Sequence, residues 1–422
     1  MELVFEGLDT YADVYLNDEC ILKADNMFRR WSIPVRQYIR EENNILKVYF
    51  HSPVKIDVPK WDALPYQYPA SNDQSENGGL FNKKISIFAR KAGYHYGWDW
   101  GPRLVTSGIW RPVYIRAWSD LRINDVFIEQ KEVGAGRAVI AGHVELDADK
   151  DMDGVLVTIT DEATGRVLGE WQADLKRGTN RVTVDFVLHK PKLWWSNGLG
   201  EPFLYRFRTD IIAGGELLDS KTERVGIRSL KVVHQPDKDG HTFYIELNGR
   251  PVFAKGANYI PSDNFLPRVT PENYKRTILD AAGVNMNMLR VWGGGIYEND
   301  VFYDLCDEHG IMIWQDFMFA CSMYPAEGAL LDNIHQEAVD NVKRLRNHAC
   351  IALWCGNNEC QDAWLGWGWK CEIERQNKEY ADKIWAQYRQ QYHVTLPGVV
   401  REYAPGTFYW PSSPFAFEGE MS

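Results

Sequence analysis

The segment that most constrains the fold is Ile351-Ala-Leu-Trp-Cys-Gly-Asn-Asn-Glu359, where a short apolar run is followed at once by glycine, two amides and a carboxylate. Such a run predicts a strand buried on both faces, as in a parallel sheet. In barrels of alternating strands and helices, the chemistry lies at the C-terminal strand ends. Glu359 is therefore a candidate general acid, because a carboxyl in low-dielectric surroundings keeps its proton more readily than one in water. An alternative is a strand-end glutamate whose side chain caps the following helix.

After residue 240 the chain alternates predicted strands and helices. The predicted strands are 252–258, 284–292, 311–316 and 351–359, with either 399–400 or 407–410 as a fifth. The predicted helices include one that opens with Thr270 as N-cap and Pro271 in its first turn, and those at 331–345 and 374–392. Repeated strand–helix units imply a parallel sheet, and a closed (β/α)8 barrel needs eight of them. Residues 231–422 therefore predict either an open α/β sheet or a barrel of which about five units are present.

The first half of the chain has the period-two alternation of strands. It is clearest at 155–159 and 182–188, and it recurs at 46–50. Residues 121–230 predict a small antiparallel sandwich with a structural role. Residues 52–90 are rich in proline, asparagine, glycine and serine, and they predict long loops.

The 17 tryptophans are the unusual part of the composition. Indole faces stack on the C–H faces of sugars, while amides and carboxylates hold the hydroxyls. Trp31 and Trp314 are expected to fill the core. Six other tryptophans lie near polar, loop-like sequence and are expected to contact sugar: Trp98, Trp100, Trp292, Trp364, Trp367 and Trp369. The glycine-framed segment 93–102 predicts a loop that presents Asp99 between two indoles.

Charge and cysteine content exclude several classes of function. The net charge of −11 is spread along the chain, so no basic nucleic-acid footprint is present, and no apolar run is long enough to span a membrane. The seven cysteines are odd in number and lack zinc-ligand spacing, which favours buried thiols over a metal site. No metal or organic cofactor is expected.

The N-terminal sequence does not indicate a cellular compartment. It lacks the basic start and apolar segment of a secretion signal, and it opens inside a strand pattern, which suggests residues missing upstream. Cytoplasm, periplasm and lysosome stay open as compartments, and so does the oligomeric state.

Six ordered segments give the chain a clear resemblance. They are Gly7-Leu-Asp-Thr10, Gly97-Trp-Asp-Trp-Gly-Pro102, Leu193-Trp-Trp-Ser-Asn-Gly198, Leu289-Arg-Val-Trp-Gly-Gly-Gly-Ile-Tyr-Glu298, Trp314-Gln-Asp-Phe-Met-Phe-Ala-Cys321 and Trp354-Cys-Gly-Asn-Asn-Glu359. With these segments the chain resembles the β-mannosidases of glycoside hydrolase family two. The resemblance implies an incomplete jelly-roll-like β-sandwich at 1–120, an immunoglobulin-like β-sandwich at 121–230, and the N-terminal part of a catalytic TIM barrel at 231–422.

The same resemblance implies a retaining exo-glycosidase that releases terminal β-D-mannose from an oligosaccharide or other glycoside. Such enzymes use two carboxyl groups about 5–5.5 Å apart. Glu359 matches the acid/base residue, and Asn358 matches a residue that contacts the sugar's 2-hydroxyl. Trp292 matches an aromatic near that position, and Arg290 a residue that braces the carboxylates.

The remaining residues that the resemblance assigns lie in two loops. Asp99, flanked by Trp98 and Trp100, matches a loop of the first domain that reaches over the barrel and binds sugar hydroxyls. Trp367 matches an aromatic near the leaving group.

The chain departs from the family pattern at the nucleophile. That glutamate belongs to the seventh barrel strand, which by strand count lies beyond residue 422, so none is expected within the chain and the chain alone is expected to be inactive. Three late residues, Glu402, Glu418 and Glu420, fit poorly, because the first lies near a fifth strand and the others lie in a terminal tail.

Two alternatives remain from the sequence. Enzymes of similar architecture act on β-galactosides or β-glucuronides, and a strand-end Asn-Glu pair occurs among them, although Trp292 and the Trp98–Trp100 loop favour mannose. A non-catalytic carbohydrate-binding protein is the second, supported by the missing nucleophile.

Overall fold

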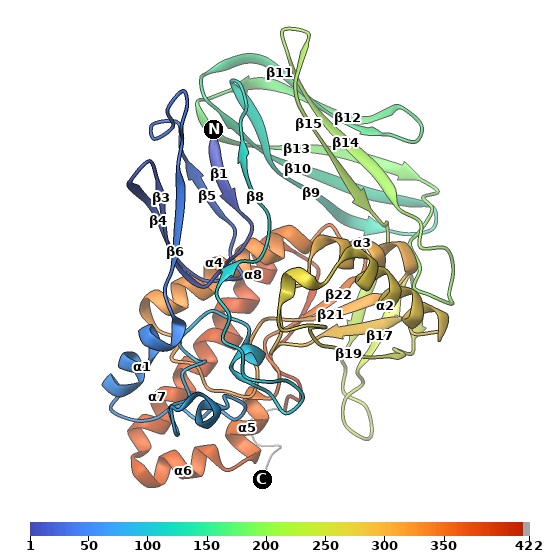
Figure 1. The fold of residues 1–422 in the computed structure, drawn as a ribbon. Coiled ribbons are helices and arrows are strands. Elements are labelled where there is room, and N and C mark those ends of the chain that lie inside the picture. Colours follow the sequence, from blue (N-terminus) through green and yellow to red (C-terminus); the bar gives the residue numbers. More distant parts are fainter. Residues whose placement is uncertain (417–422) are drawn as a thin grey trace.

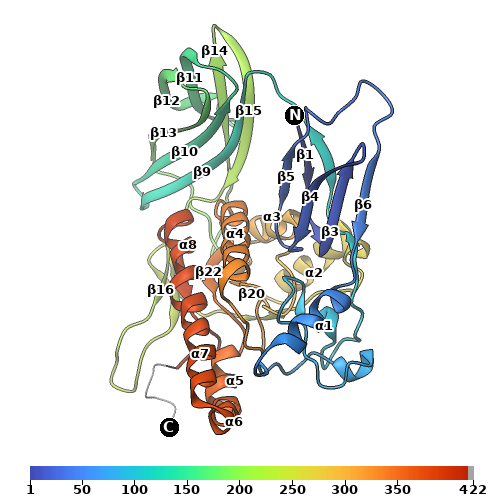
Figure 2. The ribbon, with the colours of Figure 1, turned by 90° about the vertical axis from the view of Figure 1, so that its left-hand side faces the viewer.

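The computed structural model describes residues 1–416. Two parts built of antiparallel strands lie side by side over a third part that contains parallel strands and most of the helices (Figures 1 and 2). Among the described helices, none has the length and apolar character needed to cross a membrane.

The first part, here called the first sandwich, consists of small antiparallel sheets. Its strands are β1 (Glu2–Phe5), β2 (Leu8–Asp9), β3 (Tyr11–Leu16), β4 (Glu19–Asp25), β5 (Trp31–Pro34), β6 (Leu46–Phe50), β7 (Gly108–Ile109) and β8 (Val113–Arg116). They pair in the orders β5-β1-β8, β4-β3-β6 and β2-β7. Their apolar side chains, including Phe5, Val14 and Leu16, form a small core of their own.

Residues 52–90, predicted as long loops, form most of the connection between β6 and β7, and this prediction is partly wrong. The connection contains helix α1 (Pro53–Ala63), which begins with Ser52 as N-cap and a proline in its first turn. Tyr68, Tyr94 and Tyr96 of this connection are buried in the same core as the parallel sheet, not in that of the first sandwich. The connection is therefore an ordered part of the parallel-sheet core.

The second part, here called the second sandwich, confirms the predicted antiparallel sandwich. Its strands are β9 (Leu121–Val133), β10 (Arg137–Ala148), β11 (Met152–Asp161), β12 (Arg166–Leu175), β13 (Gly178–His189), β14 (Tyr205–Ala213) and β15 (Glu216–Val225). Two sheets, β13-β10-β9 and β12-β11-β14-β15, enclose one core. Val155, Val157 and Ile159 are buried in it, as their period-two alternation predicts.

The third part begins with a small antiparallel sheet and continues as a parallel one. The antiparallel strands are β16 (Leu230–Val233), β17 (Tyr244–Leu247) and β18 (Arg250–Val252), and the parallel strands are β19 (Gly256–Tyr259), β20 (Met288–Val291), β21 (Met312–Asp316), β22 (Ile351–Cys355) and β23 (Phe408–Trp410). The first parallel strand thus starts later than predicted, because residues 250–252 pair with β17. All five residues of β22 are buried, as its apolar run predicts.

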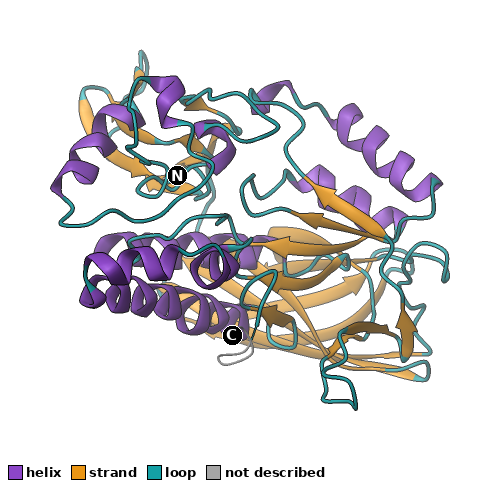
Figure 3. Cartoon of the chain, turned by 90° about the horizontal axis from the view of Figure 1, so that it is seen from below, coloured by secondary structure: helices purple, strands orange, loops and turns teal. Residues whose placement is uncertain are grey.

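Helices follow the parallel strands and lie alongside them (Figure 3). They are α2 (Pro271–Gly283), α3 (Asp300–His309), α4 (Gly328–Leu345), α5 (Cys360–Gly366), α6 (Trp369–Gln376), α7 (Lys378–Arg389) and α8 (Leu396–Tyr403). The helix predicted at 374–392 is divided at Asn377, and a π-helical turn at Gln390–Thr395 joins α7 to α8. Val399 and Val400, one option for the fifth strand, lie in α8.

The parallel strands occur in the sheet in the order of the sequence, β19-β20-β21-β22-β23. The predicted strand–helix alternation and the fifth strand at 407–410 are therefore confirmed. Within residues 1–416 the sheet is open, with β19 and β23 as its edges, so a closed TIM barrel is not established by these strands.

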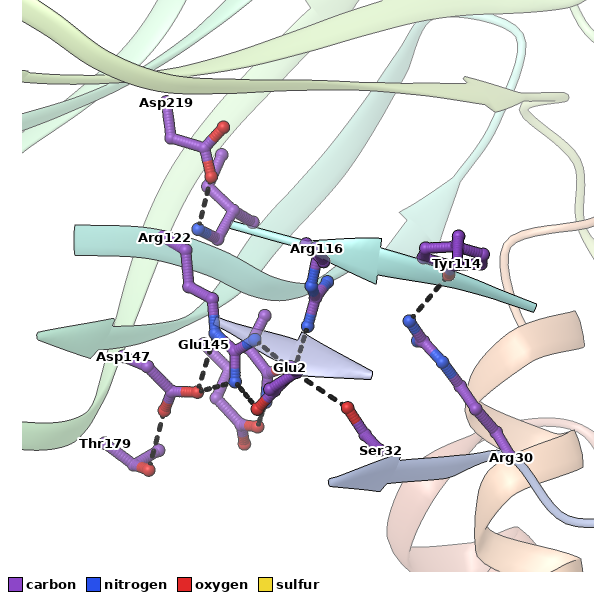
Figure 4. A network of polar contacts seen from close by, with 12 residues as sticks. Glu2, Arg30, Ser32, Tyr114, Arg116, Arg122, Glu145, Asp147, Thr179 and Asp219 are labelled. Carbon is purple, nitrogen blue, oxygen red and sulfur yellow. Dashed lines mark hydrogen bonds and ion pairs between the residues drawn. The ribbon is translucent and has the colours of Figure 1, made fainter. Parts of the chain in front are cut away.

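A buried ionic network joins the two sandwiches (Figure 4). Arg122 of β9 donates to both carboxylate oxygens of Glu2 in β1, at 2.6 and 2.9 Å, and to Asp147 Oδ2 of β10 at 2.9 Å. Burial acts to raise the pKa of Glu2, but hydrogen bonds from Arg122 and Ser32 outweigh it and lower that pKa to about 2. The network therefore ties the first sandwich to the second at neutral pH.

Candidate active site

The C-terminal end of β22 is held by its neighbours on both sides. Asn358 N donates to the carbonyl of Phe319, Cys321 N donates to the carbonyl of Asn358, and both distances are 2.9 Å. On the other side Glu359 N donates to the carbonyl of Ser413 at 3.0 Å. These bonds extend the sheet by a few residues and fix the backbone from which the Glu359 side chain projects.

The Glu359 carboxyl receives hydrogen bonds from two side chains. Cys321 Sγ lies 3.1 Å from Glu359 Oε2, and Asn358 Nδ2 lies 3.3 Å from the same oxygen. Glu359 occupies the N-cap position of α5 with a left-handed backbone (φ 60°), yet its side chain makes no capping hydrogen bond. The helix-capping alternative is therefore wrong, and the carboxyl faces the strand ends.

Arg290 connects this pair to the next strand. Its guanidinium donates to Asn358 Oδ1 at 3.0 Å and to Asp316 Oδ2 at 2.8 Å. Asp316 is fully buried and also accepts from Trp314 Nε1 at 2.9 Å and from Gly293 N at 3.0 Å. Burial raises the pKa of Asp316, while the charge of Arg290 opposes that rise.

Trp292 is placed by the same network and meets the loop of the first sandwich. A Cβ at Gly293 would lie 2.5 Å from the carbonyl oxygen of Phe319, so only glycine lets this backbone approach so closely. The Trp292 ring packs edge-on against Trp98, with centroids 4.7 Å apart, and against Trp100 at 5.8 Å. The two sequence segments predicted to form one sugar site are therefore in contact.

Asp99 lies at the exposed tip of a tight turn. The turn is closed by hydrogen bonds between the backbones of Trp98 and Gly101, and Tyr94 N donates to the carbonyl of Gly294 at 3.0 Å. The predicted loop over the strand ends (teal in Figure 1) is thus present, with Asp99 between two indoles in sequence. Beside these contacts, a small cavity lies between the loop and the strand ends, lined among others by Trp98, Gly293, Ala320 and Ser322.

Buried polar groups support the loop that carries Trp98 and Trp100. Lys91 pairs with Asp9, and Thr106 Oγ1 donates to Asp9 Oδ2 at 2.8 Å. The His95 ring contacts Thr106 Oγ1 at 3.3 Å and the carbonyl of Asn264, which follows β19, at 3.1 Å. Burial, together with the nearby Lys91 ammonium, lowers the pKa of His95 to about 3, so the ring is neutral.

The other tryptophans divide between surface and core. Trp367 lies at the C-terminal cap of α5, is 44% exposed, and donates its Nε1 to Asp362 Oδ2 at 2.8 Å. It packs edge-on against Trp369. Trp364 is 1% exposed, so its predicted sugar contact is wrong and it fills the core.

The structure adds residues that the sequence did not single out. Cys321 was expected only as a buried thiol, and Trp314 only as core, yet both donate to carboxylates at the strand ends. Ser71 of the β6–β7 connection donates through its backbone N and its Oγ to the carbonyl of Cys321, at 3.0 and 3.2 Å. The position of Cys321 and Trp314 beside strand-end polar residues was the available signal.

Of the three late glutamates, Glu402 lies within the described residues, where it is exposed on helix α8 and not on a strand. Glu418 and Glu420 lie outside the described residues.

Three side chains elsewhere have the composition of a metal site. Ligand atoms of Asp307, His348 and Cys350 lie within 4.8 Å of one another. The Asp307 carboxylate already accepts from the backbone N of Cys350 and contacts His348 Nδ1, each at 2.7 Å. Because Asp307 bonds to the His348 ring and to the Cys350 backbone, and the Cys350 thiol lies 3.7 Å from the carbonyl of Tyr303, the cluster links α3 to the start of β22.

Two family models match the chain. One is described as glycosyl hydrolase 2 galactose-binding domain-like and covers residues 1–111, and the other, glycosyl hydrolases family 2, covers residues 121–228. The β-mannosidase B proteins of Aspergillus niger and Aspergillus fumigatus are 37% and 38% identical to the chain over 417 and 419 residues. The chain belongs to glycosyl hydrolase family 2. Each alignment covers 98% of this chain and 48% of the relative, so this family member spans about half the length of these relatives.

Solved structures also resemble the chain. The β-D-mannosidase from Dictyoglomus thermophilum matches with a TM-score of 0.86 and 38% identity, over 99% of this chain and 49% of that one. Bacteroides uniformis β-glucuronidase 2 has a TM-score of 0.72 at 18% identity, over 97% of this chain and 44% of that one, and shares the fold. The resemblance inferred from the six sequence segments is confirmed.

Proposed function

We propose that the protein containing this chain is a retaining exo-β-mannosidase that releases terminal β-D-mannose by double displacement. The observation that carries the proposal is the Glu359 carboxyl, bonded by Cys321 and Asn358 at a strand end. Through Arg290 and Asp316, the same set of hydrogen bonds reaches the backbone of Gly293, next to Trp292, whose ring packs against Trp98 and Trp100. The identity of 37–38% to named β-mannosidases over almost the whole chain supports mannose as the sugar.

In this proposal Glu359 is the acid/base residue, which protonates the leaving oxygen and later deprotonates water. Asn358 binds the 2-hydroxyl, and Trp292 forms the wall beside it, where mannose and glucose differ. Arg290 holds Asn358 in place and contributes positive charge to the site.

Recognition of the rest of the sugar is assigned to the first sandwich. Asp99 binds hydroxyls on the far side of the ring, with Trp98 and Trp100 as apolar walls. Trp367 stands near the leaving group. Residues 1–120, 121–230 and 231–422 are proposed as the three domains, the last as part of a TIM barrel whose mouth is this site.

The nucleophile is proposed to lie outside the 422-residue chain, on the seventh barrel strand to which the family resemblance assigns it. Asp316 is a strand-end carboxylate of the hydrogen-bonded network, but Arg290, Trp314 and Gly293 already donate to it. A nucleophile must reach the anomeric carbon with an unoccupied oxygen. We therefore expect the 422-residue chain alone to be inactive.

The complete gene product tests the assignment. We expect it to hydrolyse 4-nitrophenyl β-D-mannoside with retention, and the β-D-galactoside at least a hundredfold more slowly. In Glu359→Gln the loss of kcat/KM should be about 10²–10⁴-fold on β-1,4-mannobiose, which needs protonation of its leaving group. On 2,4-dinitrophenyl β-D-mannoside it should be far smaller in the glycosylation step, because that leaving group departs without a proton.

A matched control is Glu402→Gln, which changes an exposed glutamate on α8 and should leave both rates unchanged. Equal losses on both substrates in Glu359→Gln would remove the acid/base role. A preference for galactoside or glucuronide would replace the mannosidase assignment by its first alternative. Mannose binding without hydrolysis by the complete protein would favour the non-catalytic one.

A further inference from the structure

Cys321 contacts the proposed acid/base residue directly, and the assigned roles leave it unused. Its Sγ lies 3.1 Å from Glu359 Oε2, and Asn358 Nδ2 lies 3.4 Å from the same sulfur. The side chain is 2% exposed. Cys321, Asn358 and the Glu359 carboxyl thus form a closed triangle of hydrogen bonds.

The backbone at Cys321 is held in a conformation that points the thiol at the carboxyl. Its φ is 45°, a left-handed value that non-glycine residues seldom adopt and that persists only where neighbours impose it. Cys321 N donates to the carbonyl of Asn358, and the carbonyl of Cys321 accepts from Ser71 N and Oγ. The connection between β6 and β7 of the first sandwich therefore braces the residue that contacts Glu359.

The Cys321 thiol remains a hydrogen-bond donor throughout the proposed reaction. Burial, together with the hydrogen bond to Glu359, raises the pKa of the Cys321 thiol well above its ordinary value. The S–H therefore stays protonated while Glu359 gains and loses its own proton. Since an S–H is a weak donor, it fixes the direction of the carboxyl at small cost to proton exchange.

We propose that Cys321 is a positioning residue for Glu359, and this inference rests on the proposed glycosidase function. Both side-chain hydrogen bonds end on Oε2, which leaves Oε1 as the oxygen that carries the proton to the leaving group. Ser71 extends the support to the first sandwich, which thereby orients the acid/base residue in addition to binding the sugar through Asp99.

Kinetics of the complete gene product test this role. Cys321→Ala should lower kcat/KM on β-1,4-mannobiose by roughly tenfold, at the low end for a hydrogen bond to a charged group. On 2,4-dinitrophenyl β-D-mannoside it should lower kcat/KM by less than about threefold, because proton donation matters little there. Cys321→Ser keeps a donor and should stay within about threefold of wild type on both substrates.

A matched control is Cys306→Ala. Cys306 is a fully buried cysteine on α3, so this variant removes a comparable buried sulfur without touching Glu359. It should leave the ratio of the two substrates unchanged. An equal loss on both substrates in Cys321→Ala, or a Cys321→Ser variant no better than Cys321→Ala, would overturn the inference.

A spectroscopic measurement on the 422-residue chain separates this inference from the proposed function. The S–H stretching band of Cys321, isolated as the difference between wild type and Cys321→Ala, should be shifted by its carboxyl partner and should move in Glu359→Gln. A band that does not respond to Glu359→Gln, in an enzyme that hydrolyses mannosides, overturns this inference alone. A complete gene product without glycosidase activity overturns the proposed function, and the catalytic part of this inference with it.

Discussion

The β6–β7 connection of the first sandwich forms one ion pair with α4 that has almost no exposure to water, whereas the second sandwich meets the parallel-sheet part through ion pairs that water partly reaches. Arg90, which precedes the Trp98 loop, forms a bidentate pair with Glu337 of α4 at 2.7 Å, and the two side chains are 2% and 1% exposed. At the second contact, Asp125 of β9 pairs with Arg346 and Lys343, and these three are 19%, 8% and 25% exposed.

The partners of the two contacts differ as well. Arg90 also donates to the carbonyl of Met318, in the loop that leads from β21 to Cys321. At the second contact, Asn347 donates to the carbonyl of Val126 at 2.7 Å and accepts from Ile128 N at 3.0 Å. The first contact is thus continuous with the candidate site, and the second continues the edge of a sandwich.

The difference indicates a division of labour. A buried ion pair costs desolvation, and it tolerates few alternative geometries once its hydrogen bonds are made. Such a contact suits a loop that must hold Asp99 and the indoles over the strand ends. Partly hydrated contacts suffice for the second sandwich, from which no described side chain enters the candidate site's hydrogen-bond network.

The largest effect is expected from Arg90→Met, which leaves Glu337 as an unpaired buried charge. Removing one partner of such a pair costs about 4 kcal/mol of unfolding free energy. Because the Met318 carbonyl also loses its donor, kcat/KM on mannosides should fall with stability. Chemical denaturation and kinetics of the complete gene product measure both.

The control for this variant is Arg30→Met. Arg30 is 40% exposed and pairs with Glu6 on the surface of the first sandwich, so the expected loss is below about 1 kcal/mol. If both arginine variants cost the same, the distinction between the contacts fails.

A smaller effect is expected from Asn347→Ala at the second contact. The variant leaves the Val126 carbonyl and the Ile128 amide without their partner, which should lower the free energy of unfolding by about 2 kcal/mol. Mannoside kinetics should not change, because the site is not involved.

Asn124→Ala is the matched asparagine within the second sandwich. It loses one side-chain hydrogen bond to Glu145 and should cost less than about 1 kcal/mol. A clear loss of kcat/KM in Asn347→Ala at intact stability would show that the second sandwich also acts on the site.

The sequence predicts those parts of the molecule that local periodicity and capping decide. The alternation at 155–159 and the fully apolar β22 each imply one burial pattern, and the structure has it. Helix α2 begins where Thr270 and Pro271 predict, with Thr270 bonded to the N–H of Asn273. In each case the deciding contacts lie within a few residues.

The parts that the sequence does not predict depend on contacts between distant residues. Val399 and Val400 resemble a strand, but their helix α8 packs against α4, and that packing outweighs β propensity. The contact of Cys321 with Glu359 requires left-handed backbones at both residues and the pairing of 319–321 with Asn358. Neither is encoded in a local pattern.

The smallest expected effect concerns the pH dependence of stability. It arises from His95, a buried residue of the same β6–β7 connection as Arg90. His95 is neutral in the folded protein because its pKa is about 3, whereas the unfolded chain binds a proton near pH 6.5. Below that pH the unfolded state binds more protons, so stability falls as the pH falls. Between pH 6.5 and 5.5 this group should remove about 1 kcal/mol.

His95→Gln isolates this contribution. The variant cannot bind the proton, so its stability should fall less steeply between pH 6.5 and 5.5 than that of the wild type, by about 1 kcal/mol over the interval. Denaturant titrations at the two pH values give the difference, whatever the variant's absolute stability. Identical slopes would mean that His95 is protonated in the folded state, beside Lys91. The groups that support the Trp98 loop would then include a buried cation beside Lys91. Low exposure to water would then no longer distinguish the interface of the first sandwich from that of the second.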